Sequence, residues 1–349
     1  MAIFSRGKRT RDDDTTPEAP EPAAPSSETE AAPAGEEPPA DEAVPQVGIS
    51  VSTFGKAPTA PAAASPSAPK PGTSTQPRSQ TAETAPEATE TIPGLRDNTV
   101  LRAALAALPE KPDSIDLLNV ARQLLQGHVF LRVRGDARAL IAEGKDLPLA
   151  TATLRDKRYA LAYSSGAALQ ASVRQDGDAQ TSAMGQPVLA VIRHVLAGSY
   201  EGLILDHASA PARAVLPRPL LEKMVEAHDE QLTIKQLLAA DRTAETAALV
   251  ADALTRVKLW VAVNRTGEDG PVGVAESRTS SGERFLEVYS HPLEVVAGGR
   301  GDQAAPITAP QLAKALRGDD ALTGVIVDPR GPWIRLRRDD LAQLLASGD

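Results

Sequence analysis

The side chains most often used in acid–base or metal chemistry are few and scattered in this sequence. Cysteine is absent, which excludes disulfides, thiolate metal sites and a cysteine nucleophile. None of the five histidines stands three or four residues from another, so no helix carries a histidine pair for a metal ion. We therefore expect no catalytic residue, no metal site and no cofactor, and we expect the protein not to be an enzyme.

Two aspartates are the acids best placed to meet a ligand, because each ends an apolar run that reads as a buried strand. Asp206 follows Gly202-Leu-Ile-Leu, and Asp328 follows Gly324-Val-Ile-Val. A carboxylate at a strand end can hold a ligand, or it can accept backbone N–H groups in the adjoining turn. The turn is the favoured interpretation, and Asp206 and Asp328 are kept as candidates for ligand binding.

A short segment near the C-terminus joins tryptophan to arginine at strand spacing. Alternation turns Ile334 and Leu336 toward the core and the intervening side chains to the opposite, exposed face. That outward set is Trp333, Arg335 and Arg337. Exposed tryptophan beside arginine is enriched at interface hot spots, so these three residues are the expected contact surface for a protein partner. The competing interpretation is that a neighbouring helix covers this face and that the arginines pair with nearby aspartates.

Nucleic acid is not an expected partner. Asp339 and Asp340 directly follow the arginine-rich segment and would repel phosphate. Residues 95–349 carry 32 acidic and 30 basic side chains, so the folded part is nearly neutral. The protein's formal charge of −9 therefore arises mainly in the first quarter of the chain.

That first quarter has the composition of a disordered tail. Residues 1–94 hold 16 of the 29 prolines, and Thr10–Pro93 has almost no large apolar side chains. Such a segment cannot bury enough surface to offset the entropy lost on ordering, which is about 1–2 kcal/mol per residue. We expect residues 1–94 to be a disordered tail. Within it, Val47–Gly55 alternates apolar and small residues and could add as a strand to a sheet edge, here or in a partner.

The start of the tail suggests two further interactions. Four basic residues lie among the first eleven, and they could give a weak contact with an anionic membrane surface. Thr15 and Thr16 stand in an acidic cluster that resembles the sites of acid-directed serine/threonine kinases. No signal peptide is expected, because acidic residues follow the basic start, and no apolar run is long enough to span a membrane. We therefore expect a cytoplasmic protein, and the excess of 27 arginines over 10 lysines suggests a GC-rich bacterial genome.

The folded part reads as one unit repeated twice. Four blocks recur in the same order, with offsets that shrink from 130 to 120 residues. The blocks are Val129–Arg134 with Leu259–Asn264, Arg158–Ser164 with Arg284–Ser290, Gly202–Asp206 with Gly324–Asp328, and Ala214–Pro217 with Ile334–Arg337. The expected domains are 95–228 as first copy, 229–242 as a linker or helical connection, and 243–349 as second copy.

Each copy is expected to mix helices with short strands. In the first copy, Asp113 or Ser114 can cap a helix that Gly127 ends, and in the second copy Thr308–Gln311 matches a capping box. Further helices are expected over 166–173, 187–197 and 218–227, and strands near 128–134, 148–153, 158–163, 202–206 and 213–216. Runs of strands with helices inserted at two places predict an α+β fold.

This pattern resembles the SseB family, named for enhanced serine sensitivity. The features that carry the resemblance are the Tyr-Ser turn into a helix at Tyr163-Ser164 and the Gly-Leu-Ile-Leu-Asp206 run followed by a Leu-Pro strand. The family implies no catalytic residue and no cofactor. We expect a non-enzymatic protein-interaction or regulatory module, with an unidentified protein as partner. The alternative is a small-molecule sensor or enzyme with a pocket between the copies, linked to serine or amino-acid metabolism as the family name implies.

Overall fold

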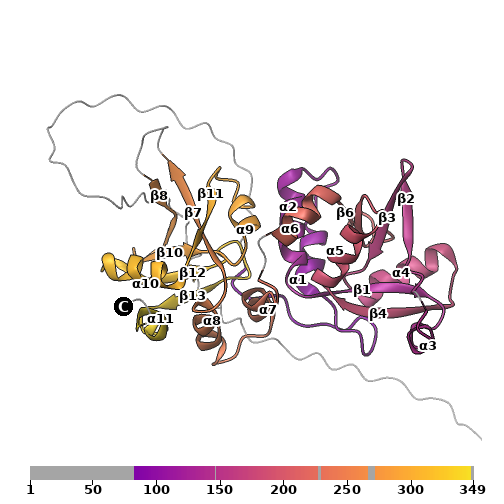
Figure 1. The fold of residues 1–349 in the computed structure, drawn as a ribbon, viewed down its shortest axis with the longest axis horizontal. Coiled ribbons are helices and arrows are strands. Elements are labelled where there is room, and N and C mark those ends of the chain that lie inside the picture. The colour runs from indigo at the N-terminus through magenta and orange to yellow at the C-terminus, as the bar shows by residue number, and fades with distance from the viewer. Residues whose placement is uncertain (1–81, 146, 227–228, 266–271, 347–349) are drawn as a thin grey trace, which may run out of the picture. The chain divides into compact units, whose positions relative to one another are not determined.

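The structure is a computed structural model that describes residues 82–145, 147–226, 229–265 and 272–346 (Figure 1). All of these residues fall within one compact unit, Ala43–Asp349. The basic N-terminus, Thr15, Thr16 and Val47–Gly55 lie outside the described residues, so the interactions expected of them remain predictions. Below, the first half means residues 82–226 and the second half means residues 229–346.

The first half mixes helices and short strands, which confirms the expected α+β class. Its helices are α1 (Thr99–Ala106), α2 (Ser114–Leu124), α3 (Ala137–Ala142), α4 (Gly166–Asp176), α5 (Val188–Ala197) and α6 (Arg218–Glu226). Its strands are β1 (His128–Arg134), β2 (Thr151–Leu154), β3 (Lys157–Ala162), β4 (Thr181–Pro187), β5 (Gly202–Leu205) and β6 (Ala214–Pro217). Every strand expected from the sequence is present here, whereas α1, α3 and β4 were not expected. β4 was missed because Met184 is its one large apolar side chain and none of its residues is fully buried.

Two sheets make up the first half, and they share a corner. β2, β3, β5 and β6 lie side by side in that order, with β3 and β5 parallel and the other pairs antiparallel. β1 and β4 form a separate antiparallel pair. Phe130 of β1 exchanges two backbone hydrogen bonds with Tyr163, which follows β3, so the two sheets meet there.

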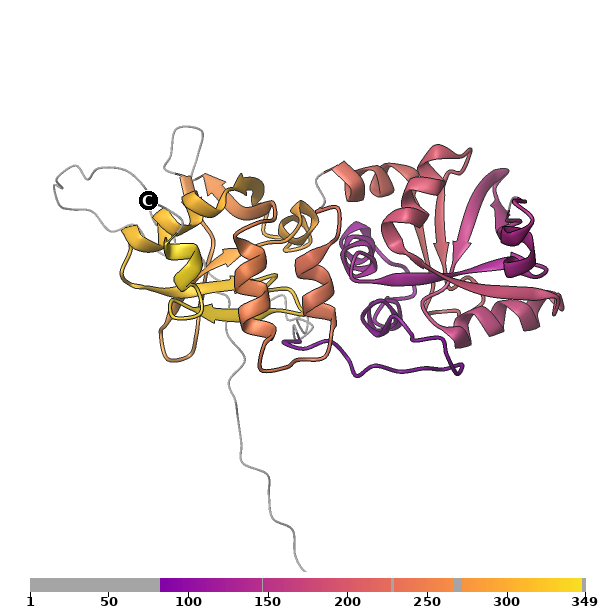
Figure 2. The same cartoon turned by 60° about the horizontal axis from the view of Figure 1, so that its bottom comes forward.

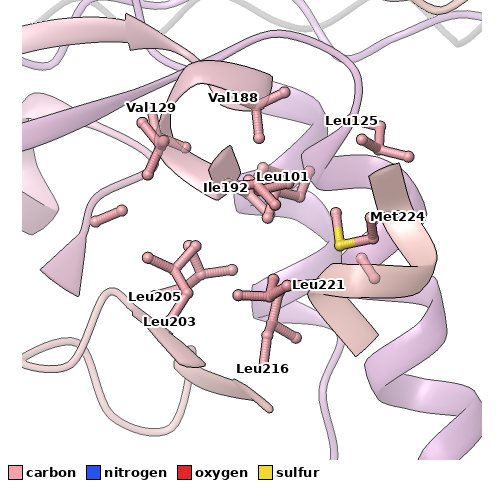
Figure 3. Close-up of a cluster of buried hydrophobic side chains, with 14 of the residues drawn as sticks. Leu101, Leu125, Val129, Val188, Ile192, Leu203, Leu205, Leu216, Leu221 and Met224 are labelled. Carbon is pink, nitrogen blue, oxygen red and sulfur yellow. The ribbon is translucent and has the colours of Figure 1, made fainter. Parts of the chain in front are cut away.

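The core of the first half lies between these sheets and the helices α1, α2, α5 and α6. Figure 3 shows Leu101, Val129, Ile192 and Leu203 among the side chains that meet in this core, each from a different element. All four are almost completely buried. The polar surfaces of these elements are thereby turned outward, and the ends of β3 and β5 are held at one edge of the core.

The second half has its own helices, strands and core. Its helices are α7 (Thr233–Ala239), α8 (Thr246–Leu254), α9 (Pro292–Val296), α10 (Ala309–Gly318) and α11 (Ala342–Ala346). Its strands are β7 (Leu259–Arg265), β8 (Val272–Val274), β9 (Glu276–Arg278), β10 (Arg284–Val288), β11 (Gln303–Ile307), β12 (Leu322–Val327) and β13 (Ile334–Arg337). Helices α7 and α8 lie side by side (Figure 2) and pack on the same apolar cluster as β10 and β12.

The sheet order of the second half matches that of the first. β9, β10, β12 and β13 follow one another, with β10 and β12 parallel and the other pairs antiparallel. β7 pairs with β11 and β8, and Trp260 exchanges two backbone hydrogen bonds with Tyr289 as Phe130 does with Tyr163. These pairings allow positions in the two halves to be compared directly.

Local sequence explains several element boundaries. Thr308 caps α10 in a capping box with Gln311, as predicted. Asp113, one of the two caps predicted for α2, caps that helix and forms a capping box with Asp116 that was not predicted. Glycine is required at Gly202 and Gly324, where a Cβ atom would lie 2.1 Å and 2.0 Å from a carbonyl oxygen of the neighbouring strand. Gly202, the first residue of β5, and Gly324, the third residue of β12, therefore allow the close approach of the next strand.

The chain is ordered earlier than composition predicted. Residues 82–97, which we call the strap, were expected to belong almost entirely to the disordered tail, but they bond to both halves. In the first half, the hydroxyl of Thr91 accepts the N–H of Ala167 at 2.8 Å, and Asp97 accepts the N–H of Gly166 at 3.2 Å. In the second half, the carbonyl of Glu83 accepts the N–H of Trp333 at 3.0 Å. Composition failed here because a few hydrogen bonds to a preformed body order the strap without a core of its own.

Candidate functional site

Asp206 stands at the end of β5, where the backbone is left-handed with φ of 50°. Its carboxylate accepts the N–H of Ser164 at 2.7 Å and also the hydroxyl of Ser164. Ser164 follows β3, the parallel neighbour of β5, so one side chain joins the ends of two adjacent strands. We call this arrangement the Asp206 latch. It differs from the turn that the sequence suggested, because the donors belong to the neighbouring strand's end and not to the turn after Asp206.

Burial of the Asp206 carboxyl changes its acidity. Burial raises its pKa to about 6, against the opposing effect of the two hydrogen bonds from Ser164. Arg102 lowers this pKa and Asp97 raises it, and both act at longer range. The carboxyl can therefore take up a proton near neutral pH.

A cavity of about 490 Å³ lies beside the latch. The polar side chains at its wall include Asp206, Ser164, Arg102 and Ser209, and the remainder of the wall is largely apolar. Both oxygens of Asp206 are already hydrogen-bonded to Ser164, and Arg102 donates to Asp97 at 2.9 Å. Asp206 and Arg102 are thus engaged with other parts of the protein, which leaves these two side chains poorly placed to attack or coordinate a substrate.

The N-terminus of α4, at the edge of this cavity, is also occupied. The hydroxyl of Ser165 accepts the N–H of Ala168, as expected of a capping serine. Asp97 accepts the N–H of Gly166 at 3.2 Å, and the hydroxyl of Thr91 accepts the N–H of Ala167 at 2.8 Å. The strap therefore supplies caps for this helix, and the free N–H groups that would bind an anion are already used.

Asp328 forms the same latch in the second half. It ends β12 with φ of 50°, and it accepts the N–H and the hydroxyl of Ser290 at 2.8 Å and 2.6 Å. Lys235 of α7 approaches its carboxylate, at 3.5 Å. Burial raises the pKa of Asp328, while the nearby Lys235 ammonium lowers it. Ser164 and Ser290 thus serve the two latches in the same way.

Glu294 of α9 lies next to the Asp328 latch and carries a buried charge between two cations. Arg122 of α2 donates to it at 3.0 Å, and Lys235 donates to its other oxygen. Burial alone would raise the pKa of Glu294, but the charges of Arg122 and Lys235 outweigh it and hold the pKa below its usual value. Arg122 comes from the first half and the other two residues from the second, so this ion cluster joins the halves.

Backbone groups complete the junction of the halves. The guanidinium of Arg122 also donates to the carbonyls of Arg330 and Gly331, each at 2.7 Å. The carbonyl of Gly331 accepts a further hydrogen bond from Gln123, at 2.9 Å. His291 accepts the N–H of Leu293 through Nδ1, so its Nε2 carries the proton and donates to the carbonyl of Met224 at 3.1 Å. His291 thus caps α9 and bonds the first half, which is a structural role.

The histidine next to the Asp206 latch is different. His207 has a lowered pKa, chiefly because of burial, and its Nδ1 has no hydrogen-bond partner among the described residues. Its ring contacts that of Tyr163, with 6.0 Å between centroids. Within the described ranges, no serine or threonine hydroxyl donates to the ring of His207.

The expected contact surface at the C-terminal strand is partly covered, and the prediction that Trp333 is exposed was wrong. Its side chain is only 4% exposed and packs with Phe285 and Ile326. The alternation itself is confirmed, since Leu336 is in the core of the second half and Ile334 packs against it. The Trp333 end of the opposite face is covered by the strap, whose Glu83 carbonyl accepts the N–H of Trp333, while Arg337 stays exposed.

The two arginines of this expected surface remain accessible to different degrees. Arg337 is 59% exposed and pairs with Glu283 at 2.8 Å. Arg335 is half-buried, with its guanidinium over the rings of Trp333 and Phe285. A cation over an aromatic ring is held in place without losing its charge. Arg335 and Arg337 thus present positive charge beside the bound strap.

The sequence did not indicate the ion cluster at the junction. Arg122, Lys235 and Glu294 lie far apart along the chain, and each sits on a different helix. One signal was available: Lys235 falls on the apolar face of α7, between the buried Ile234 and Leu238. A lysine at such a position indicates a buried partner of opposite charge.

Comparisons with known proteins identify the first half. Residues 101–223 match the SseB protein N-terminal domain. Neither the curated proteins nor the solved structures gave a match. Within the described ranges, no helix is long and apolar enough to cross a membrane, and no three acidic or histidine side chains are grouped as a metal site requires.

Proposed function

Since residues 101–223 are an SseB N-terminal domain, we propose that this SseB-family chain is a non-enzymatic, cytoplasmic regulatory module that acts by binding another protein. The polar groups most suited to chemistry support this proposal. Asp206, Asp328 and Glu294 are each engaged by hydrogen bonds or ion pairs within the fold. Groups held in this way stabilise the fold and are unsuited to a catalytic cycle.

We also propose that the second half is a second copy of the SseB unit. The two latches, the two parallel strand pairs and the Phe130 and Trp260 bridges support this interpretation. The difference lies in what surrounds the latches, since Arg122, Lys235 and Glu294 have no counterpart cluster at Asp206. The copies would then have separate roles, the second one holding the domain pair together.

The single observation that carries the binding proposal is the strap. It is an extended, acidic stretch of chain that the folded body holds through backbone hydrogen bonds, including that from Trp333 to Glu83. Arg242 adds hydrogen bonds to the carbonyls of both Glu83 and Trp333, at 3.1 Å and 2.9 Å. A surface that holds one extended acidic segment has the chemistry to hold a similar segment of a partner. Arg335 and Arg337 of β13 add positive charge to the surface that holds the strap.

The proposal is tested by replacing both arginines with acids. The full chain and the variant Arg335→Glu with Arg337→Glu are used to capture proteins from the native host, with melting temperatures measured in parallel. We expect the double variant to lose specific partners while its melting temperature changes little. Trp333→Ala is expected to lower the melting temperature strongly, because its buried ring is part of the core.

A charge-matched control separates binding at β13 from a general effect of charge. Lys111 and Arg138 are exposed residues of the first half. The variant Lys111→Glu with Arg138→Glu carries the same change in net charge and should retain every partner. Equal recovery by both double variants would contradict the proposed surface.

The junction of the halves supports a second candidate function, that of a small-molecule sensor. A cavity of about 190 Å³ lies there, between residues of the first half such as Asn98 and His128 and residues of α7. Gln126 at its wall is buried, and its Oε1 has no partner among the described residues. An unpaired buried acceptor favours a small ligand with a hydrogen-bond donor. Amino acids with small polar side chains fit this description, and thermal shift of the native chain against Gln126→Leu would test them.

A further inference from the structure

The second half contains a distinct cavity between its two sheets and α10. Its volume is about 240 Å³, and it is more enclosed than the cavity beside Asp206. Six apolar side chains make up most of its wall: Val261, Val274, Leu286, Ile307, Ala315 and Leu322. They come from β7, β8, β10, β11, α10 and β12, so the cavity is framed by regular elements and not by loops.

The corresponding space in the first half is filled by larger side chains. Strand pairing places Leu131 opposite Met184 in the first half, where Val261 stands opposite Ala305 in the second. Both Leu131 and Met184 pack into the core of the first half. The smaller pair in the second half leaves that volume open beside Val261.

Two more positions follow the same trend. The backbone pairing of β8 with β7 matches Val274 to Leu149, which packs against the first core. Counting from the helix caps matches Ala315 to the exposed His194, whose ring contacts that of Tyr200. At Leu286 the order is reversed, since strand pairing matches it to the smaller Ala160. Because the smaller side chains Val261, Val274 and Ala315 all line this one cavity, we interpret it as a built feature of the second half.

The charges at the rim point to the kind of ligand. Arg284 pairs with both acids there, Glu276 at 2.8 Å and Asp319 at 3.1 Å. Lys314 of α10 also lies at the rim, and it has no hydrogen bond or ion pair to any described residue. The acids are therefore engaged, and the ammonium of Lys314 is the charge left to meet a ligand.

We propose that this cavity binds the alkyl chain of a medium-chain carboxylic acid, with the carboxylate at Lys314. An apolar cavity of about 150 Å³ accepts benzene, so the larger volume here suits a chain of roughly eight to ten carbons. The apolar wall gives affinity through burial of the chain, and the lysine adds a charge-assisted hydrogen bond. This site is independent of the protein-binding surface at β13.

The test measures the binding of octanoate and of octanol to the full chain, by calorimetry and by thermal shift. We expect saturable octanoate binding that raises the melting temperature. Val261→Leu with Ala305→Met installs the side chains of the first half and should abolish binding while raising the melting temperature of the free protein. Lys314→Gln should weaken octanoate about tenfold and leave octanol unchanged.

A mirror variant controls for general effects on packing. Leu131→Val with Met184→Ala makes the reverse change in the first half, and it should lower stability but leave octanoate binding unaltered. Ala315→Leu is a second way to fill the cavity if the double variant does not fold. The proposal would be overturned if octanoate did not bind saturably. It would also be overturned if octanoate still bound to both cavity-filling variants, the Val261→Leu with Ala305→Met protein and the Ala315→Leu protein. Equal affinity for octanol, unaffected by Lys314→Gln, would also overturn it, since the carboxylate would then have no role.

Discussion

The Asp206 and Asp328 latches share one backbone geometry and differ in their electrostatic surroundings. In both, an aspartate with φ of 50° accepts the N–H and hydroxyl of a serine that ends the adjacent parallel strand. Asp206 has no ion pair with any residue that the structure describes, and it borders a cavity of about 490 Å³. Asp328 has Lys235 within 3.5 Å and lies beside the ion pairs of Glu294. The same pair of hydrogen bonds therefore holds a carboxyl without an adjacent cation at Asp206, and a carboxyl that belongs to a network of charges at Asp328.

This difference shows how one structural device can acquire two roles. The hydrogen bonds fix the ends of two strands, and that role needs no particular charge nearby. The buried cation Lys235 is the third residue of α7, whereas the third residue of α1 is the buried Leu101. A lysine in the core requires anions, and Glu294 and Asp328 supply them. Arg122 then links this network to the first half.

The largest effect is expected at Glu294. The change Glu294→Gln leaves Arg122 and Lys235 buried with no charge between them. Breaking a buried ion pair by removing one partner costs about 3–5 kcal/mol, so the free energy of unfolding should fall by that amount. Urea denaturation at pH 7 measures it. Lys157→Gln breaks an exposed pair with Glu201 and should leave the unfolding midpoint nearly unchanged. A small effect at Glu294 would mean that the junction is held by the backbone contacts alone.

The second-largest effect is expected from a change that makes the surroundings of the Asp328 latch resemble those of the Asp206 latch. In Lys235→Leu, Asp328 loses its cation and should resemble Asp206, with a more strongly raised pKa. We expect a loss of about 3 kcal/mol at pH 7. The loss should be smaller at pH 5, because an acid whose pKa is raised in the folded state stabilises folding most when it is protonated. Denaturation of both proteins at the two pH values checks this, and a loss independent of pH would show that Asp328 does not respond to Lys235.

The smallest effect concerns Asp206 and its dependence on pH. Folding raises the pKa of this carboxyl from its usual 3.8 to about 6, so its stabilisation is full below 3.8 and disappears as the pH rises through 6. Asp206→Asn removes the titration. The stability of the native chain relative to this variant should therefore fall by about 2 kcal/mol between pH 4 and pH 7.

Asp328→Asn supplies the matched comparison for Asp206→Asn. It removes an anion from Lys235, so we expect it to destabilise the protein at pH 7, where Asp206→Asn should not. Denaturation curves at half-unit steps of pH would resolve the two profiles. Identical profiles would mean that the surroundings of the latches do not affect their titration.

Some features of the site could be predicted from sequence, and others could not. The capping residues Asp113 and Thr308 were found because a cap and its helix are neighbours along the chain. Asp206 and Asp328 were identified at strand ends because each directly follows, along the chain, the apolar run that forms its strand. Trp333 was misjudged, because alternation assigns a side chain to one face of a strand but does not show what covers that face. The cover is the strap, which composition had assigned to the disordered tail.

The sequence alone determined the α+β class, most strands of the first half, the helix caps and the positions of the two strand-end aspartates. These depend on residues within one turn or one strand, so local physical preferences decide them. The tertiary structure decided which serine each aspartate binds, which latch receives a lysine, and where smaller side chains leave an apolar cavity. Those outcomes depend on the distances between segments that are remote in sequence. They also depend on burial, because a buried charge interacts more strongly with its neighbours. Neither quantity can be read from a single position of the sequence.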